Sequence, residues 1–458
     1  MFDSFVGFVK GAIRKMFKQT DIKQKINQNI CLSNAMADRI EMWSAMYRGN
    51  APWCKDYVKS LRKEQGICRE LANVVLNEME TEVSNENLDK LYKAATRDLN
   101  EYLQSGLALG SFVIKPLGKD KVEYITADRF LPVEFDARGR LIDVIFVQVK
   151  CVAEDSYYHR LEQHTFKNNT LTITNRAFHS NSNQDIGREV PLEVVEEWSK
   201  LPPVICYQGL ERPDFGYYRN PIKNEIDGSH CGVSVFDSAI EQIKNVDIQG
   251  ARLDWEFESG ERAINVDIMA LQAKPTVQGK KTEYVTPKLN QRLYKGLNLQ
   301  QGTDTELYKE WSPAFREDNI LNGMNEYLRQ IEFNVSLAYG DLSNPQNVDK
   351  TATECKIAKQ RKYNMVTAIQ ENLKECLEDL VYALAFYNAM TRSGYEFSCT
   401  FNDSVLTDEE TERTQDRQDV AMGAMELWEY IVKWRGKTEQ EAKAIAEAKA
   451  TADSGMIE

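Results

Sequence analysis

The chain has 458 residues, 42% hydrophobic and 28% charged, which is ordinary for a globular protein built from more than one module. Its formal net charge of −13 at pH 7 excludes a protein that simply coats nucleic acid, because that function needs a basic surface. The nine cysteines include no CxxC pair, so we expect reduced thiols rather than a disulfide framework. No segment is long and apolar enough to predict a membrane span.

The apolar spacing changes along the first half of the chain. Residues 1 to about 105 have helical spacing and predict helices. After Gly106 and Gly110 the period becomes two, which predicts a meander of antiparallel strands from Phe112 to Ala177. Helical spacing returns from Val233 to Ser259 and predicts a long helix.

Two further long helices are predicted, over Pro313–Tyr339 and Thr351–Met390, with a polar break between them. Pro313 suits the first turn of the first helix. The second pattern has no Pro or Gly, and an unbroken helix of that length would extend roughly 60 Å. A short polar segment between two such helices is well placed to change conformation. The tail beyond residue 392 is predicted to be helical and acidic.

Enzyme motifs are scarce. The phosphate-binding pattern GxxxxGK[ST] is absent, so the chain is not predicted to be an ATPase of that class. His159 and His164 lie five residues apart on a predicted strand, which places them on opposite faces and argues against a shared metal. We therefore expect no catalytic residues, no metal and no cofactor. A hydrolase with an unrecognised carboxylate site stays a rival hypothesis.

Six short motifs occur in a fixed order and together extend over most of the chain. They are Tyr47-Arg48-Gly49 with Trp53, Gly110-Ser111-Phe112 with Lys115-Pro116, Ala127-Asp128-Arg129-Phe130-Leu131-Pro132, Gly232-Val233-Ser234 with Phe236, Pro313-Ala314-Phe315-Arg316, and Thr351-Ala352-Thr353-Glu354. Each is weak alone, but in combination they resemble the portal proteins of tailed bacteriophages, specifically the siphophage-type head-to-tail connector family.

The resemblance implies an α+β portal fold with named regions. These are a wing of N-terminal helices and antiparallel strands (1–230), stem helix one (231–259), a small mixed clip (260–312), stem helix two (313–339), a tunnel loop (340–350), a long wing helix (351–391) and a helical crown (392–458).

The resemblance also implies a function and partners. The chain would form a ring of about twelve subunits at the unique capsid vertex of a virion assembled in the host cytoplasm. Double-stranded DNA would be packaged and ejected through the ring. The implied partners are the terminase large subunit, a head-tail adaptor, and the major capsid and scaffolding proteins, with no membrane. The alternative is a structural capsid or baseplate component without a DNA channel.

Three groups of residues would face the channel. Tunnel-loop candidates are Asp341, Ser343, Asn344, Gln346, Asn347 and Lys350. Acids on stem helix one that would repel phosphate are Glu241, Asp247, Asp254 and Glu258, although a solvated helix face explains them nearly as well. A basic belt that would touch DNA is formed by Lys356, Lys359, Arg361 and Lys362, and ion pairing or a solvated face is the favoured alternative for it.

Overall fold

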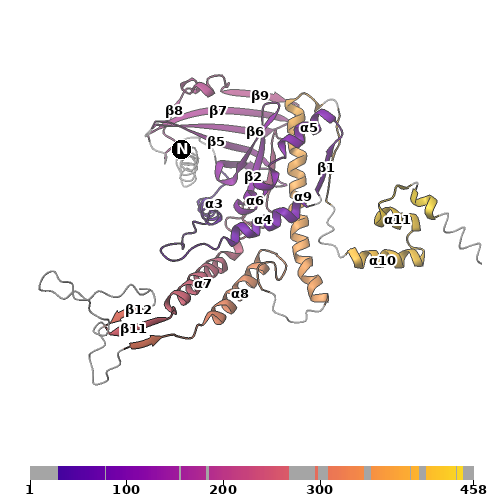
Figure 1. Ribbon diagram of the computed structural model, residues 1–458. Coiled ribbons are helices and arrows are strands. Elements are labelled where there is room, and N and C mark those ends of the chain that lie inside the picture. Colours follow the sequence, from indigo (N-terminus) through magenta and orange to yellow (C-terminus); the bar gives the residue numbers. More distant parts are fainter. Residues whose placement is uncertain are drawn as a thin grey trace, which may run out of the picture.

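The computed structural model describes residues 29–77, 79–153, 156–181, 185–267, 294–297, 308–344, 352–391, 394–401, 409–439 and 441–446. Within these ranges the chain is an α+β protein, as the change from helical to alternating apolar spacing predicts. Figure 1 shows a sheet-rich body, a helical hairpin that projects from it, and one long helix that runs along it.

Helices α3 to α6 form the helical part of the body and span Asn34–Tyr47, Lys63–Leu76, Glu86–Ala95 and Leu99–Leu109. Side chains cap α3 and α5. Ser33 Oγ accepts from the N–H of Met36 at 3.1 Å, and Asn85 Oδ1 accepts from the N–H of Leu88 at 3.2 Å. The buried faces of these helices share one hydrophobic core with the strands, so helices and sheets fold as one body.

The predicted antiparallel meander is confirmed and forms two sheets. The larger sheet has the order β4-β5-β6-β7-β8, with β9 also paired to β7, and the smaller has the order β10-β2-β3. The strands are Ser111–Leu117 (β2), Lys121–Thr126 (β3), Phe130–Phe135 (β4), Leu141–Ala153 (β5), Ser156–Lys167 (β6), Thr170–Ser180 (β7), Arg188–Val190 (β8), Val204–Gln208 (β9) and Gly216–Arg219 (β10).

The predicted long helix is α9, Ala352–Tyr387, which ends three residues before the expected Met390. Its buried apolar stripe packs against the small sheet and against α4 and α5. This stripe explains why so long a helix is stable, because its apolar positions recur on one face and enter the body's core. The residues of the stripe are Val366, Ile369, Leu373, Leu377, Leu380, Val381 and Leu384.

Helices α7, Ile240–Ser259, and α8, Glu317–Asn334, pack side by side and form the projecting hairpin (Figure 1). A short 3-10 turn, Asp237–Ala239, precedes α7. The expectation that Pro313 opens α8 is wrong, because the helix begins four residues later. Glu256 of α7 fixes that start: its carboxylate accepts from the backbone N–H of Arg316 at 2.9 Å and from its guanidinium at 2.7 Å.

Shorter elements complete the described chain. Met79–Val83 (β1) pairs antiparallel with Phe397–Phe401 (β14), which brings the segment after α9 back to the body. Ala263–Asp267 (β11), Tyr294–Leu297 (β12) and Tyr308–Trp311 (β13) form a small sheet beyond the hairpin. Glu409–Met422 (α10) and Leu427–Arg435 (α11) pack on each other. Among the described helices, none has the length and apolar character needed to cross a membrane.

Candidate functional site: the helical hairpin and its connection to the long helix

The segment that follows α8 is folded back and held by a buried carboxylate. We call residues 338–344 the loop root. Glu332, 1% exposed, accepts from the N–H groups of Gly340, Leu342 and Ser343 at 3.0, 2.6 and 2.7 Å through Oε1. Its Oε2 accepts from the Ser343 hydroxyl at 2.9 Å. Ser343 is itself buried, so the expectation that its side chain lines a channel is corrected.

A buried lysine ties the loop root to the body. Lys362 of α9, 8% exposed, lies 2.9 Å from a carboxylate oxygen of Glu70 on α4 and 3.0 Å from one of Asp341. Burial would lower the pKa of Lys362, but hydrogen bonds and charge from these two acids outweigh it and raise the pKa. Lys362 is therefore engaged inside the subunit and is not presented to DNA, and Asp341 is its partner.

The other members of the expected basic belt have separate environments. The Arg361 guanidinium lies over the ring of Phe333 on α8, 4.6 Å from its centroid. Lys359 is exposed. The side chain of Lys356 and the loop candidates Gln346, Asn347 and Lys350 lie outside the described residues. Of the three basic side chains that the structure describes, Lys362 is buried, Arg361 covers an aromatic ring and Lys359 is exposed, so these three do not share one environment.

The acids of α7 also divide into two groups. Glu241, Asp254 and Glu258 are exposed, as a channel-facing or solvated surface requires. Asp247 is buried, and its carboxylate accepts from the indole N–H of Trp53 and the backbone N–H of Leu61, both at 2.8 Å. The channel assignment of Asp247 is therefore wrong: it anchors α7 to the segment before α4.

Several motif residues meet where the hairpin joins the body. The backbones of Gly110 and Gly232 touch, since a Cβ added to Gly232 would lie 2.1 Å from the Gly110 carbonyl oxygen. The Asn220 side-chain amide donates to the carbonyl oxygens of Leu107 and Val233 at 3.0 and 2.8 Å. These contacts fix the path of the chain into α7. The close approach of the two backbones explains why both motifs have glycine at this point.

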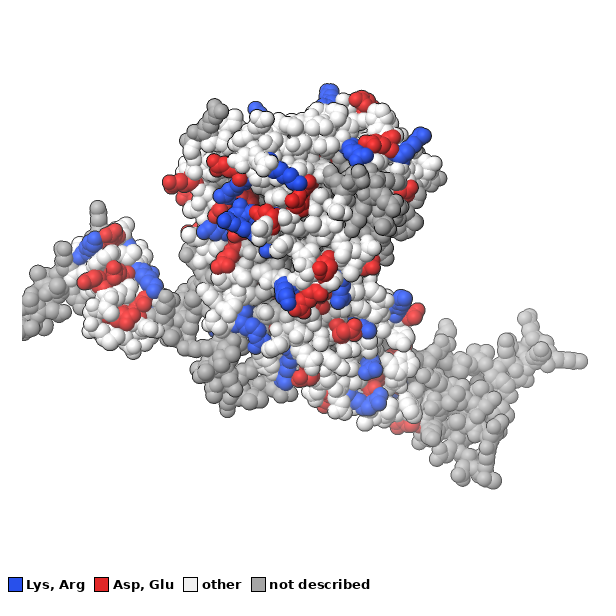
Figure 2. Space-filling view, turned by 180° about the vertical axis from the view of Figure 1, so that it is seen from behind, with Lys and Arg blue, Asp and Glu red and all other residues white. Residues whose placement is uncertain are grey.

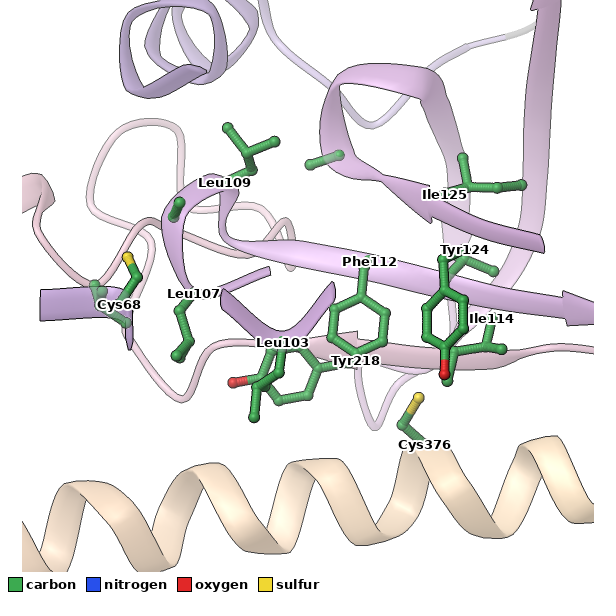
Figure 3. Packing of buried hydrophobic residues seen from close by; sticks show 14 of the residues in the cluster. Cys68, Leu103, Leu107, Leu109, Phe112, Ile114, Tyr124, Ile125, Tyr218 and Cys376 are labelled. Atoms are coloured by element: carbon green, nitrogen blue, oxygen red, sulfur yellow. The ribbon is translucent and has the colours of Figure 1, made fainter. Parts of the chain in front are cut away.

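The core beneath this junction is aromatic. Figure 3 shows Phe112 and Tyr218 side by side above α9, with Cys376 of that helix pointing toward them. The two rings stack with centroids 4.9 Å apart. The long helix is therefore fixed directly beneath the strand that carries the Gly110 motif.

The sequence did not reveal a buried network of charges between the large sheet and the end of α9. His164 Nδ1 lies 2.9 Å from Asp214 and its Nε2 lies 2.8 Å from Glu162. Glu162 also binds Lys115 at 2.9 Å, and the Tyr387 hydroxyl donates to Asp214 at 2.6 Å. Burial opposes a charge on His164, but Asp214 and Glu162 outweigh it and raise the pKa of the imidazole to about 9. The network is enclosed, so its role is to hold elements together.

The described residues contain no group of three or more His, Cys, Asp or Glu side chains arranged to hold a metal ion. His159, the other histidine of β6, is buried, and burial lowers its pKa to about 4. Figure 2 shows acidic and basic side chains interspersed over one face of the molecule, without a broad basic surface there.

No family model and no curated protein match the sequence. A chain from a solved structure of the virion of a native gene transfer agent particle is 12% identical, with a TM-score of 0.41, covering 86% of this chain and 92% of that chain. A chain from the neck of an empty particle of the same kind is 11% identical, with a TM-score of 0.39, covering 83% and 88%. Both TM-scores are below 0.5 and both identities are below 25%, so neither structure assigns a role to this chain.

Proposed function

We propose that this chain is the portal protein of a tailed bacteriophage, a non-enzymatic ring at one capsid vertex through which double-stranded DNA is packaged and ejected. The observation that carries the proposal is the path of the chain. Helix α7 leads out of the body, α8 returns, and α9, the next helix of the chain, runs along the body (Figure 1). Repeated around an axis, such hairpins would form a wall, with each loop root at the place where the wall meets the body.

The hairpin carries apolar side chains that a single subunit leaves in water. Trp255 and Phe257 of α7 are 64% and 50% exposed, and Phe333 of α8 is 66% exposed. Trp255 and Phe257 lie near the far end of the hairpin and Phe333 near the body. Large apolar side chains exposed on a helix often contact another chain. In the proposed ring the neighbouring subunits would cover them, which supports self-association through the hairpin.

The exposed acids support a channel that does not bind DNA tightly. Glu241, Asp254 and Glu258 are exposed along α7, and the whole chain has a net charge of −13. Repulsion between these carboxylates and phosphate would keep DNA from adhering to the wall as it passes.

The region assignments follow from this proposal. The body would be the wing, α7 and α8 the stem, β11 to β13 part of the clip, and α10 with α11 part of the crown. The clip would bind the terminase large subunit during packaging and a head-tail adaptor afterwards. Capsid and scaffolding proteins would surround the ring in the virion.

The mass of the native particle tests the proposal first. We expect purified protein to form rings of about twelve chains, with a central hole in negative-stain images. A monomer that also fails to form rings with scaffolding protein present would contradict the proposal. It would favour a capsid or baseplate component without a channel.

The tunnel loop needs a test of its own. Deletion of residues 345–350 removes the loop candidates beyond the root and keeps the donors that satisfy buried Glu332. We expect such particles to assemble but to fill poorly or to lose their DNA. Normal filling and retention would refute the loop's role in the channel.

A further inference from the structure

The loop root runs back along α8, and two side chains on one face of that helix hold it. Asn325 and Glu332 are seven residues apart, or about two helical turns, so they lie on the same face. Asn325 Oδ1 accepts from the N–H of Asn344 at 2.7 Å, and its Nδ2 donates to the carbonyl of the same residue at 3.3 Å. With the four bonds to Glu332, these contacts fix Gly340 to Asn344 alongside the last turns of α8.

Glu332 is the stronger of the two restraints. Its carboxylate collects three backbone N–H groups and one hydroxyl in a place closed to solvent. Hydrogen bonds to an ionised acceptor are roughly twice as strong as neutral ones, and closely spaced backbone N–H groups make a favourable anion site. The loop root therefore forms a nest whose anion is supplied by the preceding helix.

The turn itself has a backbone that few sequences adopt freely. Ser336 and Gly340 have φ angles of +60° and +100°, and the N–H of Ala338 donates to Asp341 Oδ2 at 3.0 Å. Since a positive φ is unfavourable for serine, the surrounding contacts must hold this conformation. The same Asp341 carboxylate binds Lys362, so the turn is also joined to α9 and, through Glu70, to α4.

We propose that Glu332 is the positioning residue of the loop and that Asn325 and Lys362 complete a clamp. The clamp holds the loop root in one position beside the last turns of α8. Only the expected effect on DNA filling and retention rests on the proposed function. The clamp itself belongs to the isolated subunit and is tested there.

Amide hydrogen exchange on the full-length protein measures the clamp directly. We expect Glu332→Ala to speed exchange of the Gly340, Leu342 and Ser343 amides by about tenfold or more, because they lose their acceptor. Glu332→Gln keeps one oxygen acceptor without the charge and should restore much of the protection. Asp318→Ala is the matched control, since Asp318 is an exposed acid in the first turn of the same helix, away from the loop root.

The variants separate a positioning role from a merely structural one. A positioning role predicts faster exchange in the loop root with little change in the body, and recovery in Glu332→Gln. Unchanged exchange in Glu332→Ala would overturn the clamp. If that variant does not fold, Asn325→Ala and Ser343→Ala remove single bonds and should each give a smaller increase, and no increase in either would also overturn it.

DNA filling distinguishes this inference from the proposed function. Faster exchange together with particles that fill or retain DNA poorly would support both. Faster exchange with normal filling and retention would leave the clamp standing and remove the loop's role in a channel.

Discussion

At the scale of single residues, Glu64 has an unfavourable environment that carries a testable consequence. It lies on α4, is fully buried, and neither carboxylate oxygen has a hydrogen-bond partner among the described residues. Burial raises its pKa to about 7, and nearby Asp247 adds to the effect. Glu64 therefore binds a proton more tightly in the folded state than in the unfolded state.

The sign of the pH dependence follows from this difference. Because the folded state holds the proton up to about pH 7, ionisation of Glu64 opposes folding increasingly between its ordinary pKa near 4.5 and about 7. We expect Glu64→Gln to stabilise the protein at pH 8, by on the order of 2 kcal/mol relative to its effect at pH 5. Urea unfolding at both values measures this. An effect of equal size at pH 5 and pH 8 would contradict the raised pKa.

The Gly232 contact is the second residue-scale prediction. Gly232→Ala should destabilise the protein by roughly 2 kcal/mol or more, because the new methyl group collides with the Gly110 carbonyl. Gly66→Ala is the control: it lies in α4 with open space around it, and the better helix propensity of alanine should make it neutral or slightly stabilising. Thermal unfolding compares the two. Equal melting temperatures for both variants would refute the close contact.

At the scale of elements, the His164 network joins β6 to the loop before β10 and to the end of α9. His164→Leu leaves the carboxylates of Asp214 and Glu162 buried without their shared partner, and should cost roughly 3–5 kcal/mol. His159→Leu on the same strand is the control, since both its ring nitrogens are buried without a partner in the described structure. It should change stability little.

The network also predicts a pH dependence. The pKa of His164 is raised in the folded state, so its contribution is fully present below about 6.5 and is lost as the pH rises through about 9. Unfolding measured from pH 6 to pH 10 should show this loss in the native sequence and not in His164→Leu. The same slope in both proteins would assign it to another group.

Sequence pattern predicted the elements well where one face is continuously apolar. The meander and α9 were recognised because alternation and helical spacing extend over many residues. The start of α8 was missed because Glu256, sixty residues earlier, sets it through Arg316. Asp247 and Lys362 were placed on surfaces because a charged residue gives no sign in sequence of a distant partner that buries it. Glu332 was missed for the same reason, since its donors come from a turn with no periodicity.

At the scale of the whole molecule, the proposed ring would multiply the surface charges of one subunit. Each exposed acid of α7 would be repeated once per subunit around the channel, and the field of a narrow channel adds these charges. A substitution that hardly affects a monomer should therefore have a strong effect in the assembled particle. This multiplication distinguishes a channel wall from an ordinary solvated helix face, which was the competing explanation for the same residues.

The triple substitution Glu241→Lys, Asp254→Lys and Glu258→Lys uses this difference. If the three residues line a channel, the variant should form normal rings, bind DNA in low salt, and package or eject it slowly, with the binding lost as salt rises. Reversal of Glu193, Glu196 and Glu197, which lie beside the large sheet and not on the hairpin, gives a control with the same charge change. If both variants bind and package DNA alike, the α7 acids are a solvated face and the channel must be lined by other residues.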